Sequence, residues 1–141
     1  MTEPGRVLGL DLGQARIGVA ISDDRRTVAV PLGTVHTGAP QDVKAIAGIV
    51  RDHAVAGIVV GLPVSLSGEE GEGARHARAF ADTLRSFLHL PVHLQDERLT
   101  TVEAERSLRE RGVRGRARRE VIDQAAATVI LQAWLDAARP R

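Results

Sequence analysis

Short apolar runs separated by turn residues dominate the first part of the chain. Two of them, residues 7–12 and 17–22, flank the four residues GQAR, and a third, residues 28–34, follows the polar stretch SDDRRT. Runs of this length between turn residues are typical of β-strands, and Gly13 in the first turn is free to adopt a positive φ. The pattern predicts a three-stranded antiparallel meander.

The rest of the chain alternates between helical and strand patterns. Apolar residues recur at helical spacing in residues 40–53, 74–88 and 120–138, whereas residues 57–63 and 90–97 favour strands. A further helix is predicted over residues 99–111, with a basic loop over residues 113–119 after it. The order βββαβαβαα predicts an α/β fold with a five-stranded mixed sheet. One side of this sheet is the antiparallel meander, the other side is parallel, and helices flank it.

The composition narrows the class of protein. With 141 residues, 43% of them hydrophobic and 26% charged, the chain is expected to form one domain over residues 1–141. It has no cysteine, which excludes disulfides, thiolate metal sites and cysteine nucleophiles. No apolar run reaches the roughly 18–20 residues of a membrane span, and the N-terminal MTEPGR has no apolar signal core. We therefore expect a cytoplasmic protein without a membrane partner.

One acid interrupts the first predicted strand. Asp11 lies between Leu10 and Leu12, where burial of a lone charge is costly unless the carboxylate is paired or binds a metal ion. Glu97 falls at the carboxyl end of the last predicted strand, and Asp123 falls in the first turn of the last predicted helix. Carboxylate oxygens suit Mg²⁺ or Mn²⁺, and such ions promote phosphodiester cleavage. We predict that Asp11, Glu97 and Asp123 together form a catalytic metal site.

Each of these acids also has a structural interpretation. Asp11 could cap the turn after its strand, and Asp123 could interact with the dipole of a helix N-terminus. Glu97 could form a surface ion pair with Arg98 or Arg6. Only the joint placement of the three acids points to a metal site. The five histidines show no metal-binding spacing and are expected at the surface, and no serine lies in a nucleophile elbow.

A strongly basic segment connects two of these regions. Residues 106–119, RSLRERGVRGRARR, contain seven arginines and one acid. Arginines beside a phosphodiester-cleaving centre would bind flanking phosphates, although a solvated loop of an arginine-rich chain is the alternative. Aromatic residues make up only 2% of the chain, so we expect recognition of backbone and shape rather than base stacking. The predicted nucleic-acid-binding residues are Arg16, Arg75, Arg98, Arg114, Arg116, Arg118 and Arg119.

Four blocks of the sequence together resemble one family. The blocks are LGLDLGQARIGVAISD, VVGLPVSLSGEEG, DERLTT and IDQAAATVILQAWLD, in this order over nearly the whole chain. With these blocks the chain resembles the YqgF/RuvX family of bacterial proteins. The resemblance implies an RNase H-like fold related to junction resolvases of the RuvC type and cleavage that depends on Mg²⁺ or Mn²⁺. It also implies activity either in 5′-end maturation of 16S ribosomal RNA or on Holliday junctions.

The resemblance also implies roles for individual residues. The acidic positions of the family fall on Asp11, Glu97 and Asp123, and the arginine that follows the glutamate falls on Arg98. Arg98 would steady the scissile phosphate or the carboxylates. Enzymes of the RuvC and RNase H types carry an acid at the end of the fourth strand, where this chain has Gly61, so Glu97 would substitute for it. With three acids rather than four, the substrate phosphate is expected to supply further metal ligands.

Three functions remain open at this stage. The first is a metal-dependent endonuclease acting on precursor 16S rRNA or on branched DNA; a junction substrate would favour a homodimer, because two symmetric cuts need two sites. The second is a nucleotide phosphohydrolase of the actin or sugar-kinase type, whose first phosphate loop the first block resembles, although those proteins have two such lobes. The third is a non-catalytic RNA-binding factor in ribosome assembly. We predict the first, with rRNA as substrate.

Overall fold

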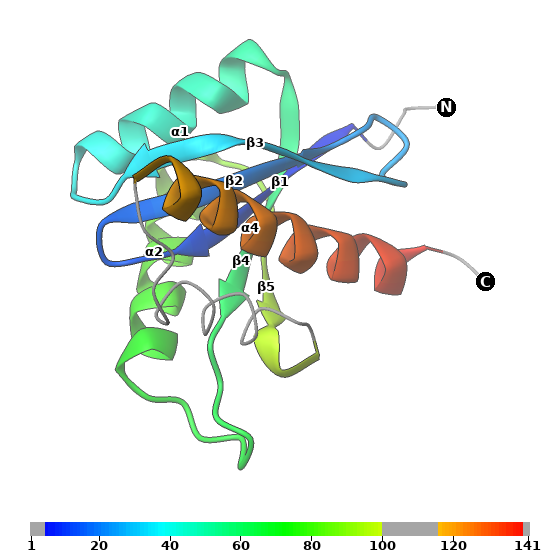
Figure 1. Cartoon of the computed structure of the whole chain (residues 1–141). Coiled ribbons are helices and arrows are strands. Elements are labelled where there is room, and N and C mark those ends of the chain that lie inside the picture. Colours follow the sequence, from blue (N-terminus) through cyan, green and yellow to red (C-terminus); the bar gives the residue numbers. More distant parts are fainter. Residues whose placement is uncertain (1–4, 100–115, 140–141) are drawn as a thin grey trace.

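A computed structural model describes residues 5–99 and 116–139 of the chain (Figure 1). The strands are β1 (Arg6–Leu12), β2 (Arg16–Ser22), β3 (Ala29–His36), β4 (Val55–Leu62) and β5 (Val92–Asp96). The helices are α1 (Gln41–Asp52), α2 (Glu72–Leu88), the short 3₁₀ helix η1 (Glu97–Leu99) and α4 (Arg116–Ala138). Within the described part, strands and helices follow one another in the predicted order.

The five strands form one mixed sheet in the order β3–β2–β1–β4–β5. β2 pairs antiparallel with β1 and with β3, whereas β4 pairs parallel with β1 and with β5. The predicted combination of an antiparallel meander with parallel strands is therefore confirmed. Because β1, β4 and β5 run in the same direction, their carboxyl ends lie at the same edge of the sheet.

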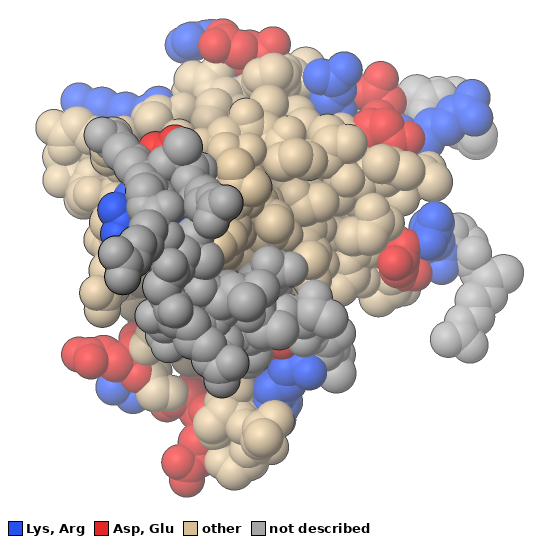
Figure 2. Space-filling model, in the orientation of Figure 1, with Lys and Arg blue, Asp and Glu red and all other residues tan. Residues whose placement is uncertain are grey.

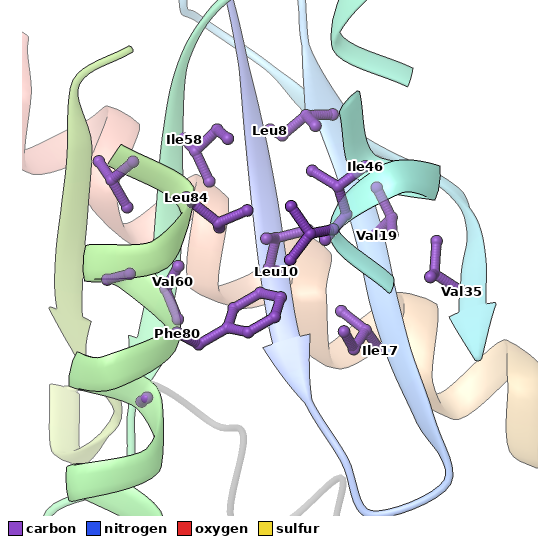
Figure 3. Close-up of a cluster of buried hydrophobic side chains, with 14 of the residues drawn as sticks. Leu8, Leu10, Ile17, Val19, Val35, Ile46, Ile58, Val60, Phe80 and Leu84 are labelled. Atoms are coloured by element: carbon purple, nitrogen blue, oxygen red, sulfur yellow. The ribbon is translucent and has the colours of Figure 1, made fainter. Parts of the chain in front are cut away.

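Helices cover both faces of this sheet. α1 and α2 pack on one face, where Leu10 and Ile46 belong to the larger hydrophobic cluster (Figure 3). α4 crosses the other face, where Val7 and Ile130 belong to a second cluster (Figure 1). Successive side chains of a strand point to opposite faces. Odd-numbered residues of β1 therefore face α4, and even-numbered residues face α1 and α2.

α4 lies close to the sheet because several strands present glycine to it. A Cβ on Gly18 in β2 would lie 2.0 Å from the carbonyl oxygen of Asp123, and a Cβ on Gly9 in β1 would lie 2.6 Å from Leu131 Cβ. These atoms belong to the helix backbone or are fixed to it, so a side chain at either glycine would displace α4 itself. Gly61 in β4 also faces α4, but there a Cβ would meet Cδ1 of Ile130, the end of a flexible side chain, at 2.6 Å. The close approach brings residues of α4 next to the strand ends.

The differences from the sequence-based expectations concern details of the elements. The sequence predicts a loop over residues 113–119, but α4 already begins at Arg116, because arginine favours helix even where no apolar periodicity marks it. Gly13 is not among the glycines with a positive φ; a Cβ there would lie 2.5 Å from the carbonyl oxygen of Arg16, so close approach within the turn requires the glycine. The helix predicted over residues 99–111 lies, beyond residue 99, outside the described residues.

Across residues 5–99 and 116–139, no helix combines the length and the apolar character needed to cross a bilayer.

Candidate active site

Asp11 lies near the end of β1 and is buried beneath α4. It is 1% exposed, and its partner across the antiparallel β1–β2 pair is Gly18. Residues directly opposite one another in such a pair point to the same face of the sheet. Since Gly18 faces Asp123 of α4, Asp11 faces α4 as well. The predicted position of this acid at the carboxyl end of the first strand is confirmed.

Asp123 approaches the same place from α4. It is 2% exposed, and its Cβ lies 3.3 Å from the position that a Cβ on Gly18 would take. The Nε of Arg16 donates a hydrogen bond of 3.0 Å to Asp123 Oδ2. The sequence predicts Asp123 in the first turn of the last helix, and this is wrong. Because α4 begins at Arg116, Asp123 lies well inside the helix. The helix dipole acts within the first turn, so it does not account for this acid.

Glu97 follows β5 and reaches back toward β4. It is 2% exposed, and both of its carboxylate oxygens are buried. Its Oε2 lies 3.1 Å, and its Cδ 3.3 Å, from the position that a Cβ on Gly61 would take. β1 and β4 pair Leu10 with Val60, so Gly61 is the neighbour of Asp11 one residue further along. The carboxylate of Glu97 therefore lies at the end of β4, on the strand next to Asp11.

The arginines considered as surface partners of Glu97 bind other acids. Arg98 forms a two-point ion pair with Asp96, with Nη2–Oδ2 at 2.6 Å and Nε–Oδ2 at 3.0 Å, while Arg6 Nε lies 3.5 Å from Asp24 Oδ1. The hydrogen bonds from Arg98 lower the pKa of Asp96 below its ordinary value, and Asp96 raises the pKa of Arg98. Together with the burial of Glu97, these pairs show that the surface ion-pair interpretation is wrong.

A crevice of about 410 Å³ opens at the carboxyl ends of the parallel strands. Its lining includes Gly61 and Glu97, Gly13 from the turn after β1, and Gly73 and His76 from the start of α2. Ligands of α/β proteins bind outside the carboxyl ends of the strands. Glu97 is therefore a buried acid that borders the space open to a ligand.

The three acids have the chemistry of a divalent-metal site but are not assembled into one. Their carboxylates are hard oxygen ligands of the kind that Mg²⁺ and Mn²⁺ prefer. Within residues 5–99 and 116–139, however, no group of three or more acidic or histidine side chains is arranged so that it could hold a metal ion. Oδ2 of Asp123 accepts its hydrogen bond from Arg16 instead. Recruitment of Asp123 to a cation would therefore compete with this ion pair.

The predicted nucleic-acid-binding arginines have different environments. The Arg16 side chain is only 15% exposed and bonds to Asp123, whereas Arg75 in α2, Arg98 in η1 and Arg119 in α4 are exposed. Arg114 lies outside the described residues, and of Arg116 and Arg118 only the backbone is described. Phosphate binding by these arginines stays a prediction.

Charged side chains of the described residues alternate in sign on the face shown in Figure 2. Lys and Arg side chains there lie beside acidic ones around the rim, and the described residues in this view form no continuous basic patch. In the ion pairs Arg78–Glu70 and Arg139–Asp136, an acidic side chain neutralises the arginine locally. Most of the arginine-rich segment of residues 106–119 lies outside the described residues, so its contribution to a basic surface stays a prediction.

The structure adds neighbours of the site that the sequence analysis did not identify. His76, expected as an ordinary surface histidine, lines the crevice, and no spacing in the sequence marks it. Asp96 binds Arg98, a contact that their proximity in the sequence could have suggested. The sequence analysis treats Gly61 only as the position where related enzymes carry an acid. An isolated glycine inside a strand is also a signal that another part of the chain approaches closely.

Known structures share this arrangement of strands and helices. The chain is similar to Thermus thermophilus RuvC in complex with Holliday junction substrate, with a TM-score of 0.54 and 14% sequence identity over 96% of this chain and 99% of that chain. A second Thermus thermophilus RuvC structure gives a TM-score of 0.50 at 14% identity, covering 94% of this chain and 95% of that one. At this identity the similarity shows the fold alone. The predicted RNase H-like fold is confirmed.

Curated relatives match the sequence over nearly its whole length. A protein of Anaeromyxobacter dehalogenans (strain 2CP-C) is 48% identical, over 96% of this chain and 99% of the relative. A protein of Thermobifida fusca (strain YX) is 53% identical, over 94% of this chain and 87% of the relative. Both carry the name "Putative pre-16S rRNA nuclease". A family model named RuvX, described as Holliday junction resolvase, matches residues 5–137.

The fold, the buried acids and these relatives define a class of protein, the hydrolases that cleave phosphodiester bonds. More closely, the chain belongs to the RuvX family. The resemblance carried by the four sequence blocks is thereby confirmed. Membership of this family leaves the alternative of an actin-like or sugar-kinase-like phosphohydrolase without support.

Proposed function

We propose that this protein is a divalent-metal-dependent endonuclease that acts on structured RNA and matures the 5′ end of precursor 16S rRNA during ribosome biogenesis. The observation that carries the proposal is the burial of three carboxylates around one end of the sheet: Asp11, Glu97 and Asp123 are each at most 2% exposed. Burial of ionised groups is costly, and binding a cation is one of the few ways to offset it. The names of the curated relatives support RNA as the substrate.

The positions of the three acids suggest the role of each in metal binding. Asp11 has Gly18 on one side, where Asp123 approaches, and Gly61 on the other, where the Glu97 carboxylate lies, so Asp11 is placed to act with both. Asp11, Glu97 and Asp123 would hold Mg²⁺ or Mn²⁺, which when bound supplies the positive charge that activates a water and stabilises the leaving oxygen. Glu97 borders the crevice and is the acid through which the substrate phosphate would meet the site.

Recognition of the substrate would depend on phosphates and shape. Arg98 follows Glu97 in the sequence, and its ion pair with Asp96 fixes its side chain. Arg98 would contact a phosphate near the scissile bond. Arg75 is exposed on the first turn of α2, whose residues Gly73 and His76 line the crevice. With few aromatic residues in the chain, base stacking contributes little, so folded RNA suits the protein better than an unstructured strand.

We treat the chain as one nuclease domain that works in the cytoplasm, because the site draws on most of its length. Its acids come from β1, η1 and α4, which are far apart in the sequence, and both helical layers pack on the same sheet. Residues 11–123 span all three acids. The absence of cysteine agrees with a reducing compartment.

The direct test compares cleavage of a precursor 16S rRNA fragment and of a mobile four-way DNA junction in the presence of Mg²⁺ or Mn²⁺. We expect cleavage of the RNA at its 5′ end, abolished by EDTA and by Asp11→Asn, while RNA binding survives. Asp24→Asn is the matched control, because Asp24 is exposed and pairs with Arg6, and it should cleave like the wild type. Cleavage by Asp11→Asn at the wild-type rate contradicts the proposal, as does RNA binding without any cleavage, which would favour a non-catalytic assembly factor.

Resolution of Holliday junctions is the second candidate, favoured by the description of the matching family model. Two symmetric cuts in a junction need two active sites, so this activity would require a homodimer. Light scattering at assay concentration, run beside the cleavage test, distinguishes the two candidates. A dimer that cuts only the junction would replace the RNA assignment, whereas a monomer that cuts only the RNA supports it.

A further inference from the structure

Gly61, the residue before the end of β4, lies directly against the carboxylate of Glu97. The position of a Cβ on Gly61 is 3.1 Å from Glu97 Oε2 and 3.3 Å from Glu97 Cδ. We propose that Gly61 is a positioning residue: because it has no side chain, the Glu97 carboxylate can occupy the end of β4 beside Asp11, although it is supplied by the turn after β5. This inference rests on the proposed function, in which Glu97 is one of the three acids of the site.

The register of the sheet explains why the space above Gly61 matters. β4 lies between β1 and β5, and Gln95 of β5 is the residue paired with Gly61. Glu97 comes two residues later, after the strand has ended, so its side chain has to reach back across one strand spacing of about 4.8 Å. A glutamate side chain can span this distance only if the volume above β4 is empty. Any side chain at position 61 would take that volume.

A methyl group at position 61 would meet two side chains that differ in their freedom to move. Ile130 Cδ1, at 2.6 Å, is the end of a flexible side chain that can change its rotamer. Glu97 is confined, because it is 2% exposed and both of its carboxylate oxygens are buried. The substitution Gly61→Ala is therefore expected to shift the carboxylate by a few tenths of an ångström, and small displacements of a catalytic group are costly in rate.

The first arm of the test measures cleavage of the 16S precursor fragment by Gly61→Ala and by Gly33→Ala. A Cβ on Gly33 in β3 meets nothing within 4 Å, so this variant controls for an alanine placed in a strand. For Gly61→Ala we expect kcat to fall about tenfold, with KM within about twofold of the wild type, because the chemistry and not the binding is disturbed. Gly33→Ala should match the wild type. Equal kcat values for the two variants overturn the inference.

A second arm separates positioning from simple overpacking. Ile130→Val removes Cδ1, the atom nearest to the added methyl group, so Gly61→Ala/Ile130→Val should regain the melting temperature of Ile130→Val alone. If Gly61 positions Glu97, the double variant still shows the tenfold loss in kcat relative to Ile130→Val. If activity returns together with stability, Gly61 serves only the packing of α4, and the inference is wrong.

A third arm keeps the inference testable if the proposed function fails. The side-chain carboxyl carbon of Glu97 is observed by ¹³C NMR at fixed pH, assigned through Glu97→Gln. We expect its chemical shift to change in Gly61→Ala but not in Gly33→Ala. An unchanged resonance overturns the inference whatever the activity. The two proposals can also fail separately. If the wild type cleaves neither substrate but the Glu97 resonance still moves in Gly61→Ala, only the nuclease proposal is refuted.

Discussion

At the scale of single residues, the site is a set of buried acids held by specific neighbours. Asp123 receives its hydrogen bond from Arg16 in an ion pair whose side chains are 3% and 15% exposed, far less than the surface pair Arg51–Asp52. An ion pair of this kind contributes little net stability, but removing one partner leaves the other charge in a poor environment. Arg16 is therefore expected to be important for folding as well as for the site.

The Arg16–Asp123 pair gives the first prediction. Arg16→Gln should lower the free energy of unfolding by about 3 kcal/mol, because the buried Asp123 loses its counter-charge. Urea denaturation measures the change, and Arg51→Gln, at an exposed pair, is the control with a change of about 0.5 kcal/mol or less. In the Arg16→Gln/Asp123→Asn double variant the two losses should not add. Full additivity would show that the pair is not energetically coupled.

His93 and Trp134 form a second residue-scale feature, away from the acids. Their rings stack with centroids 4.9 Å apart, and Trp134 is the only tryptophan of the chain. Partial desolvation, and to a smaller extent the positive charges of Arg26 and Arg85, lowers the pKa of His93 below the ordinary histidine value of 6.5. The imidazole is therefore neutral in the folded protein at neutral pH. Its contribution to stability is present above pH 6.5 and is lost as the pH falls through the lowered pKa.

Tryptophan fluorescence tests this assignment. Because imidazolium quenches a neighbouring indole, emission of the folded protein should decrease as the pH falls, with a midpoint below 6.5. His93→Gln should abolish the transition without changing emission at pH 8. A midpoint at or above 6.5, or a transition that survives in His93→Gln, would show that the charge on His93 is not disfavoured in the fold.

At the scale of elements, the glycines that face α4 decide how close the helix can lie to the sheet. The Cβ of an alanine at Gly18 would lie 2.0 Å from a backbone oxygen of α4, a contact that no rotamer change can relieve. Gly9 acts in the same way on the neighbouring strand β1, where a Cβ would lie 2.6 Å from Leu131 Cβ and 3.0 Å from the carbonyl oxygen of Ala127. The approach of α4 brings Asp123 to the end of β1, so these glycines set the geometry of the site.

Gly18→Ala is the prediction at this scale. We expect the free energy of unfolding to fall by about 3 kcal/mol, at the upper end of the usual cost of overpacking, because helix and sheet must separate. Gly33→Ala, which meets open space in β3, should change it by less than about 1 kcal/mol. Urea denaturation of both variants measures the difference. Equal stabilities would mean that α4 tolerates a larger distance from the sheet.

The same elements show how far the sequence could predict the structure. The two apolar runs around the turn GQAR in residues 7–22 are sufficient to predict the hairpin and Asp11 at the end of β1, because such runs and turns are local properties of the sequence. The burial of Glu97 was not predictable in this way, since DER has the polar composition of a surface turn. Its position depends on Gly61, a residue 36 positions earlier in the sequence. The start of α4 at Arg116 was missed because arginines at helical positions leave no apolar pattern.

At the scale of the whole molecule, the distribution of charge along the sequence suggests which segment binds a large substrate. The net charge is only +1, yet seven arginines fall within residues 106–119. On the face shown in Figure 2, Lys and Arg side chains of the described residues lie beside acidic ones. Affinity for nucleic acid should therefore depend strongly on this one segment of the sequence.

The salt dependence of RNA binding tests this distribution of charge. Replacing Arg114, Arg116, Arg118 and Arg119 by alanine should reduce the slope of log affinity against log salt concentration by about 3, because each phosphate contact contributes roughly 0.7 to 0.9. Fluorescence anisotropy with a labelled precursor fragment measures the slope. Replacing Arg51 and Arg139, which pair with acids at the surface, should leave it unchanged. An unchanged slope in the fourfold variant would locate the phosphate contacts elsewhere.

The central claim is that Asp11, Glu97 and Asp123 jointly bind a divalent cation. Calorimetric titration of the purified protein with Mn²⁺ measures this without any assumption about the substrate. We predict one saturable binding event that Asp11→Asn and Glu97→Gln each weaken by about a hundredfold or more, whereas Asp52→Asn, at an exposed acid paired with Arg51, binds like the wild type. Equal Mn²⁺ affinity of the wild type, Asp11→Asn and Glu97→Gln would contradict the claim.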